Sequence, residues 1–265
     1  MTRPRSRAWN RALRKAGTAA WRGARHPRRA LWLAAWGVVA GRDAQVTYSQ
    51  DGEDRVLARL FEHADPGFYV DIGAHHPTRF SNTAVLYRAG WHGINVDPRP
   101  GTRRLFEKER SSDITLELGV AGTQGTLSYY VFNDQGLNTF SRARADDLEA
   151  TTDYHVTRRL TIPTLTLSAV LDRYLPPGQQ IDLLSIDVEG LDLEVLRSND
   201  WQRYQPRIVI TEDLENRTRD LCAETPSVEF LRGVGYSPIA KTGNSVFFAC
   251  PQFGQATSPL EDGER

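Results

Sequence analysis

The spacing of apolar residues alternates between two periods from residue 51 onward. Short apolar runs bounded by turn residues predict buried strands at 68–72, 93–97, 114–120, 181–187 and 207–212. Apolar residues on one helical face predict helices at 51–61, 81–89 (with Ser81 as N-cap), 98–110 (beginning near Pro100), 167–174, 189–197 and 226–233. Strands separated by helices indicate parallel βαβ units, so we expect an α/β fold with a mostly parallel sheet.

Other segments alternate apolar with polar residues, as half-exposed strands do. Residues 126–132 and 156–165 predict an inserted β meander, with a loop at 133–153 between its strands. Residues 236–241 and 245–249 predict a terminal antiparallel hairpin that turns through 242–244. We therefore expect one main domain at 45–250, between an N-terminal tail (1–44) and a C-terminal tail (251–265).

Charge separates the N-terminal tail from the rest of the chain. The 265 residues contain 33 basic and 33 acidic side chains, but residues 1–42 hold 11 of the basic ones and no acid, which leaves a net charge of −11 afterwards. The longest uncharged apolar run, 30–41, is shorter than the roughly 20 residues of a membrane span. Arg42 ends this run without a clean signal-peptide cleavage site, and the two cysteines lack metal-ligand spacing. These observations predict a cytoplasmic protein.

Four tryptophans accompany the arginines of the tail, at positions 9, 21, 32 and 36. This composition is typical of helices that bind peripherally to anionic membranes, although an unstructured tail with incidental tryptophans explains it equally well. The acidic remainder shows no nucleic-acid recognition motif, so no nucleic-acid partner is expected.

Four predicted strands carry an acid at or near their carboxyl end: Asp71, Asp97, Asp187 and Glu212. Ligands of open α/β sheets bind beyond these strand ends. A single such acid is as readily explained as a helix N-cap, but four along one sheet edge favour a binding site.

The turn after the first strand, from Asp71 to Pro77, contains one glycine. It lacks the three glycines of a dinucleotide site, and the chain has no P-loop signature, which disfavours a nicotinamide-dependent oxidoreductase and nucleoside triphosphate chemistry. A glycine turn flanked by acids suits a ligand with an amino group and a ribose but no phosphate. S-adenosylmethionine (SAM) is such a ligand.

Five segments together resemble the FkbM-type methyltransferases, which are class I SAM-dependent enzymes. They are SQDGED at 49–54, YVDIGAHHP at 69–77, FSNT at 80–83, GWHGINVD at 90–97 and IDVEG at 186–190. The resemblance covers roughly residues 48–213. It implies a Rossmann-like class I methyltransferase fold, and we expect seven strands ending in the antiparallel hairpin.

The resemblance also implies site roles. It places the cofactor over Asp71, Gly73 and Ala74, sets Asp97 on the ribose, and brings Asp187 and Glu189 near the reacting centre. Members of the family often carry Glu where this chain has Asp97, one methylene shorter.

An acceptor hydroxyl must lose its proton or be polarised by a cation during methyl transfer. Asp187 is the predicted base, with Glu189 and Glu212 as supporting acids. The same carboxylates could instead bind Mg²⁺, or Asp187 and Glu189 could only cap and charge the following helix.

Four other side chains are candidates for binding the acceptor. His75 and His76 are adjacent on a loop without further ligands at metal spacing, so they favour a substrate pocket over zinc. Asn82 lies at a helix start, and Asn138 lies in the insertion, where its alternative is a turn residue. The expected activity is O-methylation of a sugar, a glycan or glycolipid precursor, or a natural product. The alternative is a cofactor-binding or scaffolding protein without turnover.

Overall fold

The computed structural model describes residues 45–213, 220–221 and 223–253. Contacts divide the chain into residues 1–47 and 48–265, and every element named below belongs to the second unit. The expected tail 1–44 lies outside the described residues, as does most of the tail 251–265. Among the described helices, none is long and apolar enough to cross a bilayer.

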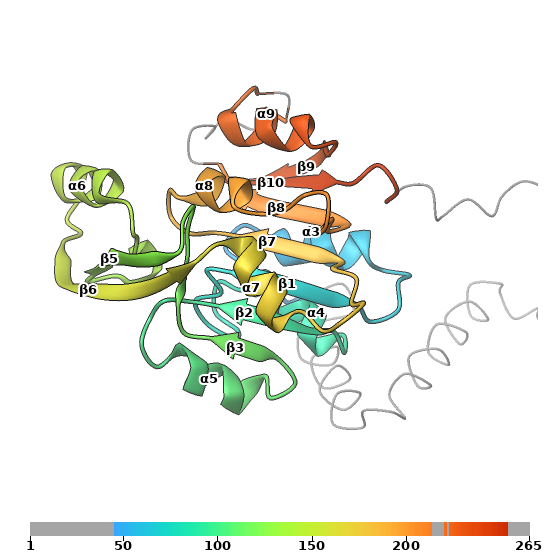
Figure 1. Cartoon of the computed structure of the whole chain (residues 1–265), viewed down its shortest axis with the longest axis horizontal. Helices are drawn as coiled ribbons and strands as arrows, with labels where there is room; N and C mark the ends of the chain where they lie inside the picture. The colour runs from blue at the N-terminus through green and yellow to red at the C-terminus, as the bar shows by residue number, and fades with distance from the viewer. Residues whose placement is uncertain (1–44, 214–219, 222, 254–265) are drawn as a thin grey trace, which may run out of the picture. The chain divides into compact units, whose positions relative to one another are not determined.

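Seven strands form the main sheet: β1 (Phe68–Ile72), β2 (His92–Val96), β3 (Ile114–Leu116), β7 (Leu183–Ile186), β8 (Ile208–Glu212), β9 (Ser237–Thr242) and β10 (Ser245–Ala249). Their order is β3-β2-β1-β7-β8-β10-β9. Neighbours from β3 to β8 run parallel, and β10 is antiparallel to both β8 and β9. The predicted sheet and terminal hairpin are confirmed. The strand order reverses between β1 and β7, where such sheets bind ligands (Figure 1).

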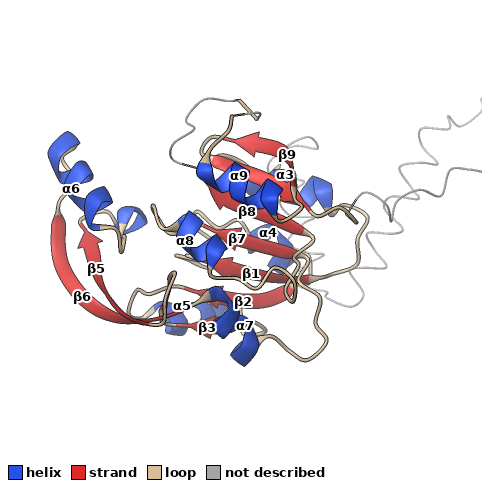
Figure 2. Ribbon diagram, turned by 45° about the horizontal axis from the view of Figure 1, so that its top comes forward, coloured by secondary structure: helices blue, strands red, loops and turns tan. Residues whose placement is uncertain are grey.

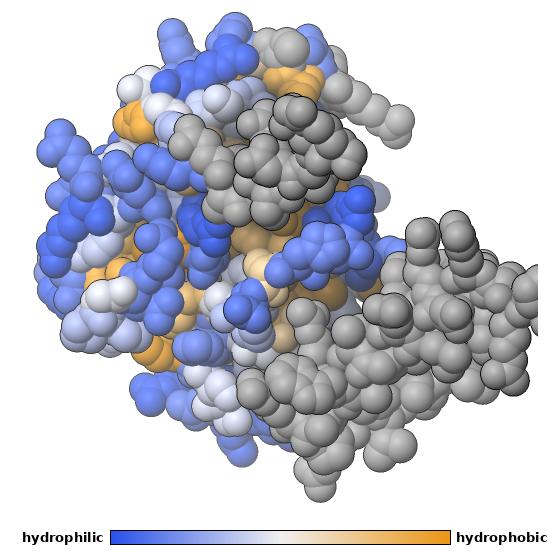
Figure 3. Space-filling view, turned by 90° about the vertical axis from the view of Figure 1, so that its right-hand side faces the viewer, coloured by the Kyte–Doolittle hydropathy of each residue, from blue (hydrophilic) through white to orange (hydrophobic). Residues whose placement is uncertain are grey.

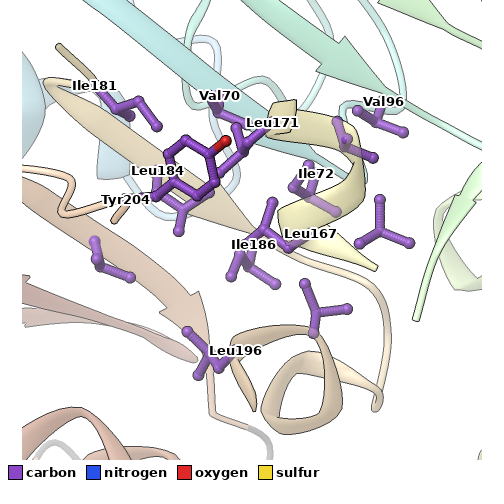
Figure 4. Packing of buried hydrophobic residues seen from close by; sticks show 14 of the residues in the cluster. Val70, Ile72, Val96, Leu167, Leu171, Ile181, Leu184, Ile186, Leu196 and Tyr204 are labelled. Atoms are coloured by element: carbon purple, nitrogen blue, oxygen red, sulfur yellow. The ribbon is translucent and has the colours of Figure 1, made fainter. Parts of the chain in front are cut away.

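Helices cover both faces of the sheet because successive side chains of a strand point to opposite faces. Val70 and Ile72 of β1 pack in one core cluster with α7 (Leu167–Tyr174), α8 (Asp192–Arg197) and α9 (Pro226–Gly233), part of which is shown in Figure 4. Tyr69 belongs to a second cluster with α3 (Glu53–Leu60) and α4 (Ala84–Arg88). The helix α5 (Thr102–Glu109) follows β2. The coloured residues in Figure 3 are mainly hydrophilic, with smaller hydrophobic areas between them.

A smaller three-stranded sheet forms an inserted lobe beside the main sheet (Figures 1 and 2). Its elements are β4 (Gly119–Val120), β5 (Gly125–Phe132), the 3-10 helix η1 (Gln135–Leu137), α6 (Arg142–Thr151) and β6 (Val156–Leu165). β6 lies between β4 and β5 and is antiparallel to β5, as the predicted meander requires. The loop predicted at 133–153 was wrong, because η1 and α6 occupy much of it. Only Ala145 and Leu148 of α6 are buried, which is too few to reveal a helix by periodicity.

The strand predicted at 114–120 was also wrong as a single element. β3 pairs with β2 in the main sheet, whereas β4 pairs with β6 in the inserted lobe. A Cβ atom at Gly119 would lie 2.6 Å from the Phe140 ring, so the chain crosses between the sheets at a residue without a side chain.

Two predicted helix starts require correction. The helix α4 begins at Ala84 and not at Ser81, because the Ser81 hydroxyl accepts a hydrogen bond from Arg110 and Phe80 has a left-handed φ of 54°. The helix α8 begins at Asp192 and not at Glu189, because Glu189 and Gly190 have φ values of 53° and 102°. Both displaced starts leave irregular backbone at the carboxyl ends of strands.

Candidate active site

A pocket lies at the carboxyl ends of β1, β2 and β7 and is closed on another side by the inserted lobe. We call it the strand-end pocket. Its lining consists of Gln50, Ile72, Gly73, His75, Phe80, Val96, Asp97, Pro98, Leu118, Val120, Tyr129, Gln135, Gly136, Asn138, Phe140, Asp187, Val188 and Glu189. The described non-glycine residues with positive φ are His75, Phe80 and Glu189, and all three line this pocket. Such strained backbone is typical of functional sites.

Gly73 allows the turns after β1 and β7 to approach each other. Its φ is 84°, and a Cβ atom built there would lie 1.7 Å from the Asp187 carbonyl oxygen. The amide groups of Gly73 and Ala74 both donate to the Val96 carbonyl, at 2.9 and 3.1 Å. A side chain at position 73 would therefore separate the two strand ends that form the pocket floor.

Asp97 is buried at the pocket wall and organises the neighbouring backbone. Its carboxylate accepts hydrogen bonds from the amides of His75 (3.0 Å) and Arg99 (2.9 Å) and from the Thr102 hydroxyl (2.9 Å). Burial raises the pKa of Asp97, although the nearby Arg99 charge opposes this effect. A carboxylate offers about four acceptor positions, so roughly one remains for a ligand hydroxyl.

Asp71 lies inside β1 and does not line the pocket. Its carboxylate accepts a hydrogen bond from the Thr83 hydroxyl at 2.7 Å. The buried guanidinium of Arg110 donates to Thr83 Oγ1 (2.8 Å), Ser81 Oγ (2.7 Å) and the Pro77 carbonyl. This network fixes the loop between β1 and α4, so the structure places Asp71 behind the turn that follows β1.

The proposed acceptor residues divide into two groups. His75 and Asn138 line the pocket, whereas His76 and Asn82 do not. The Nδ1 atom of His76 accepts the amides of Thr78 and Arg79, both at 3.1 Å, and Asn82 donates to Ser185 Oγ at 3.2 Å. Burial, assisted by the Arg99 charge, lowers the pKa of His75 to about 4, so this imidazole is neutral at pH 7.

Asp187, Glu189 and Glu212 form a compact group that we call the acid cluster. Carboxylate oxygens of the three residues lie within 4.8 Å of one another, close enough to share one cation. Asp187 and Glu189 line the pocket, and Glu212 stands behind them at the end of β8. Two oxygens of the cluster, Glu189 Oε2 and Glu212 Oε2, are buried without a hydrogen-bond partner in the described part of the chain.

Burial raises the pKa values of all three acids, and repulsion within the cluster adds to this effect for Asp187 and Glu212. Burial, followed by the charges of Glu212 and Glu189, raises the pKa of Asp187 well above its usual value. Burial and the Glu189 charge raise the pKa of Glu212 to about 8. Burial also raises the pKa of Glu189, while the Arg144 guanidinium opposes that rise. Carboxyl groups with raised pKa values are suited to exchanging a proton near neutral pH.

None of the four strand-end acids is a helix N-cap. The N-cap residues of the helices that follow them are Thr83, Gly101, Leu191 and Thr225. The backbone before α8 is held by Asp192, whose carboxylate accepts the amides of Val188 (3.3 Å) and Gly190 (3.1 Å). The capping explanation therefore fails for Asp71, Asp97, Asp187 and Glu212.

Several pocket residues were missed by the sequence analysis. Tyr129 and Phe140 come from the inserted lobe, with ring centroids 4.7 Å apart, and Arg144 reaches the acid cluster from α6. Gln50 also lines the pocket. It belongs to segment 49–54, one of the five segments that resemble the FkbM-type methyltransferases, so the sequence could have pointed to it. Tyr129, Phe140 and Arg144 carried no sequence signal. They reach the pocket through tertiary contacts of the inserted lobe, and the apolar pattern did not reveal the helix α6 that carries Arg144.

A known protein family matches more than half of the chain. The model of the family described as "Methyltransferase FkbM domain" matches residues 71–238. Among solved structures, the chain is similar to an O-methyltransferase from Bacillus cereus in complex with SAH, at 10% identity and a TM-score of 0.37, over 82% of this chain and 87% of that chain. No curated protein sequence matches the chain.

Proposed function

Because the chain belongs to the FkbM family of SAM-dependent methyltransferases, we propose that it methylates a hydroxyl group of a small-molecule or glycan acceptor. The acceptor classes that we propose are a sugar, a glycan or glycolipid precursor, and a natural product. The observation that carries O-methylation is the acid cluster, whose three carboxylates have raised pKa values and two of whose members, Asp187 and Glu189, line the strand-end pocket. A hydroxyl acceptor needs such a group because it is a poor nucleophile at neutral pH.

The strand-end pocket fits the cofactor chemically. Asp97 would accept a ribose hydroxyl, and Pro98, Leu118 and Val120 provide apolar surface for a base. Gly73 leaves the turn after β1 open to close approach. The nearby acids also tolerate the positive sulfonium charge that makes the cofactor a methyl donor.

Asp187 is the residue that we assign as general base. Its carboxylate would take the proton of the acceptor hydroxyl while the acceptor oxygen forms its bond to the methyl carbon. The bond from that carbon to sulfur breaks in the same in-line displacement, which leaves the methylated acceptor and S-adenosylhomocysteine (SAH). Burial, and after it the charges of Glu212 and Glu189, raises the pKa of Asp187, which makes it a stronger base than an ordinary aspartate.

The test uses SAM labelled with ¹³C in its methyl group. The protein is incubated with fractionated small-molecule, glycan and lipid extracts, and the products are analysed by NMR. We expect an enriched methoxy carbon that is absent with the Asp187→Asn variant. Label on nitrogen or sulfur would contradict O-methylation. Cofactor binding without label in any fraction would favour the non-catalytic alternative.

We also propose that the N-terminal tail contacts anionic membranes, since its 11 basic residues accompany four tryptophans and an apolar run. Flotation with vesicles containing phosphatidylserine compares the full chain with a variant lacking residues 1–42. The full chain should float and the truncated chain should not, while both bind SAH equally. Equal flotation would reject this role of the tail.

A further inference from the structure

Glu189 is held in an unusual conformation by the inserted lobe. Its φ of 53° is uncommon for a residue with a long side chain. The Thr139 hydroxyl donates to the Glu189 carbonyl at 2.8 Å, and the same hydroxyl accepts the Ser141 amide at 2.9 Å. The lobe therefore fixes the backbone of a pocket residue that belongs to a distant part of the sequence.

The side chain of Glu189 is held from the same direction. Arg144 Nη2 lies 3.5 Å from Glu189 Oε2, and the two side chains are only 17% and 16% exposed. Within the described residues, this is the single ion pair made by the acid cluster. Arg144 is itself placed by the start of α6, where Ser141 Oγ accepts the Arg144 amide at 3.2 Å.

A guanidinium in this position has a direct consequence for cations. Three carboxylates with oxygens inside 4.8 Å would otherwise attract a divalent ion. Arg144 places its positive charge 3.5 Å from an oxygen of one potential ligand, in a partly buried setting where charges are weakly screened. The protein thereby supplies the cation that such a cluster needs.

We propose that Arg144 is a positioning residue that acts as the permanent counter-cation of the acid cluster, so that methyl transfer requires no divalent metal ion. The proposal rests on the proposed function in that it takes the acid cluster as the reacting centre. Thr139 holds the Glu189 backbone, and Arg144 forms an ion pair with its carboxylate, which leaves Asp187 free to meet the acceptor.

The test measures Mn²⁺ binding by electron paramagnetic resonance and needs no acceptor, so its failure is separate from failure of the proposed function. The full-length wild type is compared with Arg144→Gln, which removes the charge, and Arg144→Lys, which keeps it. Arg142→Gln is the matched control, because Arg142 lies on the same helix in an exposed ion pair with Asp146. SAH affinity, measured by calorimetry, reports whether each variant keeps its pocket.

We expect Arg144→Gln to bind Mn²⁺ at least tenfold more tightly than the wild type, and Arg144→Lys and Arg142→Gln to behave like the wild type. Adding Asp187→Asn to Arg144→Gln should abolish the gain, which assigns the new binding to the acid cluster. All variants should bind SAH within about twofold of the wild type. Equal Mn²⁺ binding by the wild type and Arg144→Gln, whether tight or weak in both, would overturn the proposal. Loss of SAH binding in Arg144→Gln would also overturn it.

Discussion

The acids at the ends of β1 and β2 differ from those at the ends of β7 and β8 in how fully they are hydrogen-bonded. Asp97 accepts three hydrogen bonds, and Asp71 belongs to the buried Arg110 network. In the acid cluster, one oxygen of Glu212 and one of Glu189 are buried without a hydrogen-bond partner among the described residues, and of the three acids only Glu189 pairs with the guanidinium of Arg144. Acids that accept several hydrogen bonds fix the backbone around the pocket, whereas buried acids that lack donors keep a high affinity for protons and suit proton transfer.

The largest expected effect comes from removing the base. Asp187→Asn should lower methyl transfer by about 10²-fold or more, because general-base catalysis contributes on that scale. The melting temperature of the variant should stay within a few degrees of the wild type, and its SAH affinity should be unchanged. The substitution removes charge repulsion but breaks no hydrogen bond that holds the fold in the described part of the chain. Rates of ¹³C-methyl transfer and calorimetry measure both quantities. Normal turnover would exclude Asp187 as the base. It would also remove the functional difference between the acids at the ends of β1 and β2 and those at the ends of β7 and β8.

Gly73→Ala tests the close approach between the two regions. Gly101→Ala is the matched control, because Gly101 has a φ of 93° but a Cβ atom there would meet no atom within 4 Å, whereas a Cβ atom at position 73 would meet the Asp187 carbonyl at 1.7 Å. Both variants place a Cβ atom on a left-handed backbone, at a cost of about 1–2 kcal/mol, but only Gly73→Ala should also push the strand ends apart. We expect a loss of SAH affinity well above tenfold for Gly73→Ala alone. Equal affinities by calorimetry would show that the approach is irrelevant to binding.

Asp97→Ala tests the role of the acid that accepts three hydrogen bonds beside the pocket. Losing a hydrogen bond to a charged group costs about 1.5–3 kcal/mol, so SAH affinity should fall at least roughly tenfold. The three donors left unpaired should also lower the melting temperature, in contrast to Asp187→Asn. Calorimetric titration at a temperature far below unfolding separates the two effects. An unchanged affinity in the folded variant would remove Asp97 from the ribose site.

Glu212→Gln should stabilise the protein in a pH-dependent way. The pKa of Glu212 is raised from 4.5 to about 8, so its contribution to folding is fully present below pH 4.5 and is lost as pH rises through about 8. Relative to the wild type, the variant should therefore gain melting temperature progressively from pH 5 to pH 9. The gain should reach about 2–8 °C, equivalent to about 1–2 kcal/mol. A difference in melting temperature that is constant across this range, measured by scanning calorimetry, would contradict the raised pKa of Glu212, which burial and the Glu189 charge produce.

The strand-end acids were predictable from sequence because an acid that closes an apolar run is visible without any tertiary contact. Their different surroundings were not. Asp71 lies one residue inside β1, so the alternation of the strand turns its side chain toward the face of the sheet that α3 and α4 cover. Asp97 and Asp187 each follow the last residue of their strand. A shift of one residue lies below the precision of an apolar pattern. Arg144 was out of reach because its contact with Glu189 joins an exposed, weakly patterned helix to a loop in another lobe.

The chain enters and leaves the inserted lobe side by side. Gly119 pairs with Thr164 and Val120 with Leu165, so β4 and the end of β6 form a single parallel seam. A segment whose two ends meet at one seam is exchangeable as a cassette, because a replacement needs only to span that fixed gap and leaves the main sheet unchanged. Replacing residues 121–163 as a unit would therefore rebuild the wall of the strand-end pocket that Tyr129, Asn138 and Phe140 form, provided that the new segment again presents a hydroxyl and a cation to the loop after β7.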